Sequence, residues 1–317
     1  MTEPWPDELL SEHASAFCWA MPRAFGGDEL DPLELHLRYE QLARRSLSLA
    51  LILTQRDSAV GILAAAGKSD LLDEVRRGAF VTVGIAQLTT SRQGGPPAMV
   101  WRDERLDGVI PWATGAAHAT YIVAGAAVDG QQVLYALPRE APGVSVEAPM
   151  PLVALADTWT SAVRCKNVAY DPTLHLLGPA ANVLSLRRKS VPIPQAFLAL
   201  GHCRGALDLI AGHDSDRGRR LHERFEEQIE ALHLRVVAAC AAGADPAQIP
   251  VLRGECNDLA LRSTPAAVAL YTGSALLVSH PAQRLAREAM FLLVWSCPDP
   301  VIDCTVELLS GGGDEPP

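Results

Sequence analysis

The chain has 317 residues, 49% of them hydrophobic and 20% charged, which is enough apolar material for a sizeable core and for more than one structural domain. Its formal net charge of −10 argues against a nucleic-acid binder, and its seven scattered cysteines contain no CxxC pair that would indicate a zinc site or a disulfide framework. No apolar signal segment or membrane-spanning stretch is evident, so we expect a cytoplasmic protein without a membrane span.

The N-terminal part, 1–78, is predicted to be a helical domain. Apolar residues recur at three- and four-residue spacing in 33–55, and Asp31 followed by Pro32 is a typical helix start. A second helix is predicted over 69–78, with Ser69 or Asp70 as its cap and Gly78 as its stop.

The middle part, 79–177, contains short β-branched or alternating runs separated by turn signals. These runs lie at 80–88, 108–114, 120–128, 131–137, 143–148 and 161–170. Many short strands at near-regular spacing predict an antiparallel barrel or sandwich.

The C-terminal part, 178–310, is predicted to be a four-helix bundle, followed by a disordered tail at 311–317. The four helices are expected over 194–212, 221–243, 259–279 and 281–295. The segment 259–279 is apolar on nearly every face, more than the core of one subunit covers, which predicts a homodimer or a homotetramer.

The order of a helical domain, a β domain and a four-helix bundle resembles the acyl-CoA dehydrogenase superfamily of flavoproteins, from about Met21 to Leu309. The segment 21–51 is similar to the family's Pro-x-x-(aromatic)-Gly-Gly turn and the helix after it, 106–126 is similar to its "G-x-K-x-W-(I/V)-T" strand, and 279–291 resembles "P-x-x-R-x-x-R-D". The resemblance implies a mostly α fold with a central β domain, FAD as the cofactor and an acyl-CoA thioester as the substrate class.

The resemblance also implies residues on the flavin side. Trp112 and Thr114 match the Trp and Thr that flank the isoalloxazine ring in the family, and two residues apart on one strand they are expected to point to the same side. Thr89 and Gly94 match the Thr and the Gly of the family's "T-E-P-x-x-G-S" loop, whose Glu, Pro and Ser are replaced here.

For the adenosine half of the cofactor the match is partial. Arg217 falls on the Arg of the family's "R-x-x-F-G", and Gln228 falls on a Gln further along; in the family these residues come from a neighbouring subunit. Of "Q-x-x-G-G-x-G" only Gly273 remains. The alternative for Arg217 is a solvated basic face shared with Arg219 and Arg220.

The catalytic carboxylate of the family is missing. Flavin-dependent α,β-dehydrogenation needs a base for the α-proton, and the family uses the Glu of "Y-E-G-T" nine residues after the Arg of "R-D". Nine residues after Arg287 stands Ser296, and a second family location for the base matches Val191. A serine hydroxyl does not replace a carboxylate without an adjacent base of its own.

Neighbouring groups leave two alternatives for the base open. Asp299 and Asp303 lie close in sequence to Ser296, and Cys297 is adjacent to it, although a cysteine at an apolar helix end is more often an inert small hydrophobe. The nine histidines show no metal-ligand spacing, so no metal site is predicted.

Three functions therefore remain open. The first is an acyl-CoA dehydrogenase-like oxidoreductase whose base has moved or whose reaction has changed. The second is a flavin-dependent monooxygenase on the same fold, which needs no base for an α-proton. The third is a non-catalytic homologue that binds a flavin or an acyl thioester.

Overall fold

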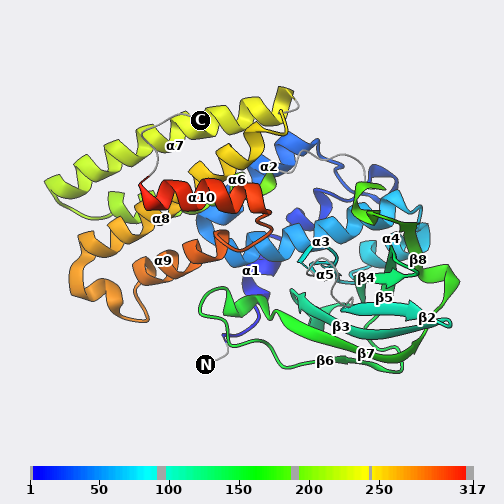
Figure 1. Cartoon of the computed structure of the whole chain (residues 1–317). Helices are drawn as coiled ribbons and strands as arrows, with labels where there is room; N and C mark the ends of the chain where they lie inside the picture. The colour runs from blue at the N-terminus through cyan, green and yellow to red at the C-terminus, as the bar shows by residue number, and fades with distance from the viewer. Residues whose placement is uncertain (1–2, 91–97, 187–192, 243–244, 312–317) are drawn as a thin grey trace. The chain divides into compact units, whose positions relative to one another are not determined.

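The computed structural model describes residues 3–90, 98–186, 193–242 and 245–311 (Figure 1). The chain forms two compact units, each assembled from segments that are distant in sequence. The first unit comprises Met1–Leu30, Leu51–Leu152 and Ala156–Ser190, and the second comprises Asp31–Ala50, Val153–Leu155 and Val191–Pro317.

Helices open the first unit, as the sequence predicts. They are α1 (Asp7–Glu12), the 3₁₀ turns η1 (Ala14–Cys18) and η2 (Arg23–Phe25), α3 (Leu47–Ala65), whose first residues belong to the second unit, and α4 (Ser69–Arg76). The predicted cap of α4 is wrong: the N-cap is Lys68, and no side chain caps this end. The predicted stop is near the true one, because Gly78 follows the helix with a φ of 106° that other residues rarely adopt.

The β-rich part of the first unit is one eight-stranded sheet. Its strands are β1 (Val81–Gly84), β2 (Met99–Arg102), β3 (Arg105–Ala113), β4 (Tyr121–Val128), β5 (Gln131–Pro138), β6 (Val144–Val146), β7 (Ser161–Ala169) and β8 (His175–Ala180). A short helix, α5 (Gln87–Thr90), follows β1, and the 3₁₀ turns are η3 (Ala116–His118), η4 (Ala156–Thr158), η5 (Pro172–Leu174) and η6 (Val183–Leu186).

The sheet is mixed, which corrects the expectation of purely antiparallel strands. The strand order is β6-β7-β3-β2-β4-β5-β8, with β1 paired to β4. Both β1 and β2 run parallel to β4, while the other pairs are antiparallel. A parallel pair needs a long connection, and the chain between β1 and β4 supplies one. The predicted runs located six of these eight strands and missed β2 and β8, and a hydrophobic pattern carries no information about strand direction.

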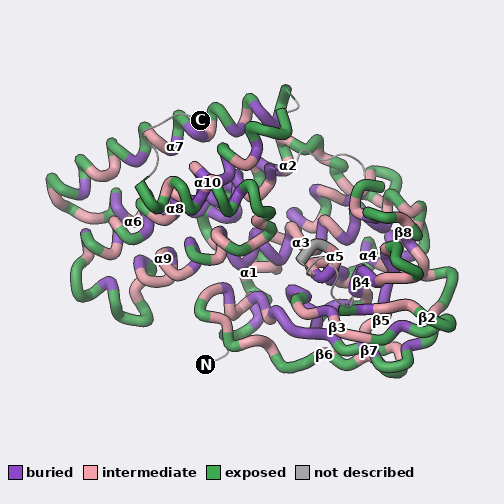
Figure 2. Tube along the Cα trace, viewed as in Figure 1, coloured by how far each residue is buried: buried purple, intermediate pink, exposed green. Residues whose placement is uncertain are grey.

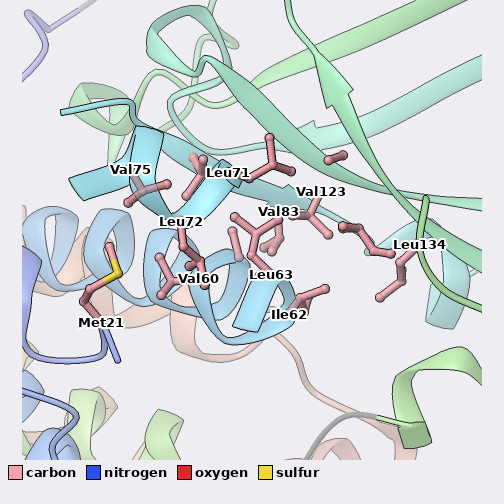
Figure 3. Close-up of a cluster of buried hydrophobic side chains, with 14 of the residues drawn as sticks. Met21, Val60, Ile62, Leu63, Leu71, Leu72, Val75, Val83, Val123 and Leu134 are labelled. Atoms are coloured by element: carbon pink, nitrogen blue, oxygen red, sulfur yellow. The ribbon is translucent and has the colours of Figure 1, made fainter. Parts of the chain in front are cut away.

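Two hydrophobic clusters fill the first unit. One joins α3 and α4 to β1, β4 and β5 through side chains such as Leu63, Leu72, Val83 and Val123 (Figure 3). The other lies among the strands and includes the fully buried Tyr135. Burial of these side chains, at roughly 25 cal/mol per Å² of apolar surface, is the main stabilising contribution to the unit.

Helix α3 has the length and composition of a membrane span but the burial of a core helix. Leu47–Ala65 has a mean hydropathy of 1.3, and 72% of that window is buried inside the protein. It is the one such helix in the described ranges. We therefore interpret α3 as a core helix, which packs its apolar residues against protein rather than lipid.

The second unit is helical. It contains α2 (Pro32–Arg45), α6 (Pro194–Ala211), α7 (Asp216–Ala242), α8 (Gln248–Tyr271), the 3₁₀ turn η7 (Thr272–Leu276), α9 (Pro281–Leu292) and α10 (Asp299–Ser310). The Asp31 carboxylate accepts hydrogen bonds from the backbone N–H groups of Leu33 and Glu34, which confirms the predicted start of α2.

Burial is uneven among these helices (Figure 2). In α6, 11 of 18 residues are buried, whereas in α7 only 7 of 27 are. The predicted helix over 259–279 is displaced: α8 begins at Gln248 and ends at Tyr271. Helix α10 was not predicted as a separate helix, because its two buried residues, Val301 and Thr305, are too few to give a strong periodic signal.

Candidate functional site

Trp112 and Thr114 lie at the end of β3 in the first unit, but in different surroundings. Trp112 is 51% exposed, whereas Thr114 is 8% exposed and follows the last strand residue, Ala113. The pairing of β3 with β7 shifts register between Ile110 and Ala113, which interrupts strand alternation at this point. The sequence placed both side chains on one face because it gave no sign of this irregularity.

The Thr114 hydroxyl belongs to a buried cluster of threonines. Its Oγ1 lies 3.3 Å from Oγ1 of Thr160, which lies 2.9 Å from Oγ1 of Thr158. A hydroxyl is both donor and acceptor, so this chain of three can leave one O–H directed to a further acceptor. Trp112, two residues earlier on the strand, supplies a large exposed apolar surface of the kind that a planar ring system needs.

Two of the predicted flavin-side residues fall outside what can be described. Gly94 lies in the 91–97 segment, beyond the described residues, and the side chain of Thr89, at the end of α5, also lies outside them. Val191, the second family location of the base, lies outside the described residues as well. Their predicted roles stay predictions.

Arg217 and Gln228 lie on α7 in the second unit. Arg217 is exposed and forms no ion pair with the described residues, whereas Arg219, two positions on, pairs with Asp216. The Gln228 Oε1 accepts a hydrogen bond of 2.7 Å from Arg262 Nη1 on α8, and its Nε2 donates to the Arg224 carbonyl. Arg217 is thus available to an anion, while the Gln228 amide is already engaged.

Gly273 lies in η7, directly after α8. It is exposed, and a Cβ placed on it would have no atom within 4 Å. The preceding residue, Thr272, has a φ of 54°, so the chain turns sharply where the family has its glycine-rich segment. Backbone exposed in this way can approach a ligand closely.

Ser296 stands on the turn that follows α9. The helix begins at Pro281, and the His280 imidazole caps this end by accepting from the Ala282 N–H. It ends at Leu292, and the rings of Phe291 and Trp295 stack with centroids 5.4 Å apart. Ser296 is exposed and has a φ of 51°, a left-handed conformation that a serine seldom adopts.

A buried arginine that the sequence did not single out holds this turn. Arg253 on α8 is 4% exposed, and its Nη2 donates to the Trp295 carbonyl at 3.4 Å and to Cys297 Sγ at 3.7 Å. The structure shows no carboxylate paired with it among the described residues. Burial lowers the pKa of Arg253, and the nearby Cys297 thiol partly offsets this. The segment 252–257 mixes apolar, charged and small residues, so its pattern did not reveal which side faces inward.

The surroundings of Cys297 keep its thiol neutral, as expected of an inert cysteine and not of a catalytic base. Its Sγ donates to the Leu292 carbonyl at 3.2 Å, a bond that favours the neutral thiol. Burial raises the pKa of Cys297 above its ordinary value, although Arg253 acts in the opposite direction. Asp299 and Asp303, the acids left open by the sequence, are both exposed on α10.

Helix α9, which leads into the Ser296 turn, is anchored by the buried His202 on α6. His202 Nε2 donates to the Leu285 carbonyl at 2.8 Å, and burial lowers the pKa of His202 to about 4, so the imidazole is neutral. On α9 itself Arg284 and Glu288 are paired at 2.8 Å. A buried polar group with a partner of this kind fixes the position of one helix against another.

A second buried network joins three helices of this unit. The Glu40 carboxylate on α2 is 1% exposed and lies 2.7 Å from Arg204 Nε on α6 and 3.0 Å from His233 Nδ1 on α7. Arg204 also pairs with the more exposed Glu230 at 2.6 Å. These partners are far apart in sequence, so no local motif pointed to them. Their role is structural, because each contact lies within the packed helices.

No protein-family model and no curated protein matches the chain. Solved structures do match it over nearly its whole length. Butyryl-CoA dehydrogenase from Megasphaera elsdenii has a TM-score of 0.80 at 18% identity, with 97% of this chain and 91% of that chain covered. A glutaryl-CoA dehydrogenase from Mycobacterium smegmatis in complex with FADH2 has a TM-score of 0.79 at 17% identity, covering 97% and 87%. A 3-HSA hydroxylase from Rhodococcus sp. RHA1 has a TM-score of 0.74 at 18% identity, covering 99% and 91%.

The chain therefore has the acyl-CoA dehydrogenase fold, and the resemblance inferred from the sequence is confirmed at the level of the fold. The predicted fold class, helices followed by a β domain and a helical C-terminal part, is confirmed with it. Proteins with different reactions share this fold, so the reaction must be argued from the residues.

The described residues fit a flavin in part. On the first unit, the exposed indole of Trp112 offers an apolar wall, and Thr114, two residues on, belongs to a buried hydroxyl cluster. On the second unit, Arg217 offers an exposed guanidinium for a pyrophosphate, and Gly273 offers accessible backbone. No group of three metal-ligating side chains occurs in the described part of the chain.

Proposed function

We propose that this protein is an acyl-CoA dehydrogenase-like flavoprotein oxidoreductase that binds FAD and has Ser296 in place of the usual catalytic glutamate. The observation that carries the proposal is the exposed Ser296 on the turn after α9, on a chain with the acyl-CoA dehydrogenase fold. The half-exposed Trp112 supports the cofactor assignment, because a large apolar side chain in that setting is suited to stacking on a planar ring.

The residues of the second unit explain why dehydrogenation should be weak. Bound FAD supplies the acceptor for a hydride from the substrate. Removal of the α-proton falls to the protein, and neither the Ser296 hydroxyl nor the Cys297 thiol, whose pKa is raised by burial, is a base at neutral pH. We therefore expect α,β-dehydrogenation of simple acyl-CoA thioesters to be slow or replaced by another reaction.

The test is Ser296→Glu, with Ser279→Glu as the matched control. Ser279 is also exposed and lies just before α9, so it receives the same change in charge and size. A general base contributes about 10²- to 10⁴-fold, so Ser296→Glu should raise the rate of flavin reduction by an acyl-CoA by that order. Rapid reduction in the native protein, together with no effect of Ser296→Glu, would contradict the assignment.

The alternative is a flavin-dependent monooxygenase. It is favoured by the missing carboxylate, since oxygen transfer needs no α-proton base, and by the hydroxylase of the same fold. A yellow protein that consumes oxygen only when its flavin is reduced by free reduced flavin or a nicotinamide would support it. A colourless protein would support the third candidate, a non-catalytic homologue that binds an acyl thioester.

We further propose that the protein is cytoplasmic and forms a homodimer or homotetramer. Exposed apolar side chains in the second unit support the assembly: Leu276, Leu277 and Val278 are 72%, 60% and 85% exposed. Three consecutive apolar residues in water are unusual for a monomer and typical of an interaction surface.

A further inference from the structure

An open cavity lies in the first unit, at one end of the sheet. Its volume is about 530 Å³, within the range of small-molecule sites. Its wall includes Trp101, Glu104, Val128, Tyr170, His175 and Pro179. Most of these groups are apolar or aromatic, and Glu104 brings a carboxylate to the wall.

The cavity is separate from the candidate flavin face on the same unit. Glu104 directly precedes β3, and Trp112 lies eight positions further along the strand. At about 3.3 Å per residue the two ends are roughly 25 Å apart. The cavity therefore does not belong to the site proposed for the cofactor.

Aromatic rings are concentrated at this cavity although they make up only 5% of the chain. The rings of Trp101 and Tyr170 stack with centroids 3.8 Å apart, and Tyr135 stacks behind Tyr170 at 5.0 Å. The stack holds the Trp101 ring rigidly at the cavity wall, so an electron-rich ring face there has little conformational freedom to lose on binding.

The polar atoms of these rings are already paired. His175 Nε2 lies 2.9 Å from the Gly178 carbonyl, so it carries the proton, and Nδ1 accepts from the Tyr170 hydroxyl at 2.6 Å. Burial, together with Tyr135 and Asp171, raises the pKa of Tyr170 to about 12, which keeps the phenol neutral. A ligand would therefore meet ring surfaces here, not free donors.

The Glu104 carboxylate has no partner among the residues that the structure describes. It lies on the β2–β3 turn, where its backbone carbonyl accepts from the Tyr170 N–H at 3.0 Å. Within the described ranges, its side chain forms no hydrogen bond or ion pair. An exposed carboxylate beside stacked aromatic rings attracts positive charge.

No lysine or arginine is among the described residues that line the cavity. Arg102 pairs with Arg105 across the hairpin, one position from the pair of Trp101 with the buried Leu106. Because side chains alternate along a strand, both arginines lie on the face opposite Trp101. The Lys68 ammonium, near Asp171, is bound to the Thr173 carbonyl at 2.6 Å.

We propose that this cavity binds a small organic cation, a methylated or similarly substituted ammonium group, packed on the Trp101 ring at the cavity wall with Glu104 balancing its charge. A cation–π contact strengthens binding by only about two- to thirtyfold, so a small probe should bind weakly, with a Kd of about a millimolar or above. The proposal is independent of the flavin and of the reaction.

The test uses choline and its neutral isostere 3,3-dimethylbutan-1-ol as probes, measured by titration calorimetry and by ligand-observed NMR. Choline should bind saturably, and the neutral probe should bind at least about tenfold more weakly. Glu104→Gln should weaken choline binding by roughly three- to tenfold, while Asp103→Asn, one residue away on the same turn, should leave it unchanged. Trp101→Leu should abolish it.

Equal binding of the two probes, unchanged binding in Glu104→Gln, or no saturable binding of choline would each overturn the proposal. If Trp101→Leu fails to fold, the probe pair and the Glu104→Gln variant still decide, because Glu104 is exposed and its replacement preserves the turn.

Discussion

Gly201→Ala should destabilise the second unit, because the glycine lies where α6 meets the backbone of α2. A Cβ built on Gly201 would lie 2.2 Å from the Glu40 carbonyl oxygen and 2.9 Å from the Ala43 Cβ. Optimal contacts between carbon atoms are about 3.5–4.0 Å, so the two helices must separate by about 1 Å. Neither obstacle is the flexible end of a side chain.

Two effects oppose each other at this position. Alanine is about 1 kcal/mol better than glycine in a helix interior, whereas an extra methyl group in a packed core costs about 1–3 kcal/mol. The backbone of α2 must move, and Glu40 would move with it away from its buried partners. We therefore take the upper end of the packing cost of about 1–3 kcal/mol. The expected net loss is roughly 2 kcal/mol of unfolding free energy.

Gly61→Ala is the control for helix propensity. Gly61 lies inside α3 and is exposed, and a Cβ added to it would meet no atom within 4 Å. This variant should gain about 0.5–1 kcal/mol. Urea unfolding followed by circular dichroism measures both changes. A Gly201→Ala protein as stable as the parent, or stabilised like Gly61→Ala, would refute the packing argument.

Burial lowers the pKa of His36 to about 4, below its unfolded value of about 6.5, so its contribution to stability is present above pH 6.5 and lost as the pH falls towards 4. Between pH 7 and pH 4 the parent should lose roughly 3 kcal/mol of unfolding free energy through His36. In His36→Gln the unfolding free energy, measured with urea, should therefore fall less steeply over this pH range. Equal pH dependence in the two proteins would contradict the assignment. Val278→Lys should lower the molecular mass measured by light scattering, because a charge in the interface favours monomers. An unchanged mass would show that Val278 does not lie in the interface. Trp112→Ala should lower flavin occupancy in the purified protein while Trp101→Leu, at the other end of the sheet, should not; equal occupancy would count against the flavin face.

The order of the elements could be predicted from the sequence because it depends on local signals. The pair Asp31-Pro32 and the β-branched run that became β4 each determine structure within a few residues. Strand direction, by contrast, depends on the path of the chain between strands, which is why the parallel pairing of β1 with β4 was missed.

The candidate site was predictable only where a family motif supplied it. Ser296 was assigned by its spacing from Arg287 and lies on the turn after α9, and its role in the site stays a prediction. Arg253 was missed because the feature that distinguishes it, burial with no carboxylate partner in the described ranges, arises from tertiary packing alone. The burial of Thr114 was missed for a similar reason. It follows a register irregularity between β3 and β7, which an alternating sequence pattern does not reveal.

The Glu40 network has a consequence for how the protein is made. Glu40 leaves the ribosome early, but its partners Arg204 and His233 follow 164 and 193 residues later. At about 5–20 residues per second, α2 waits on the order of 10–30 s before α6 exists. During synthesis its apolar face is a place where chaperones would bind. A fragment that begins after residue 190 would also lack α2, so the helical unit cannot be expressed from the C-terminal half alone without exposing α6.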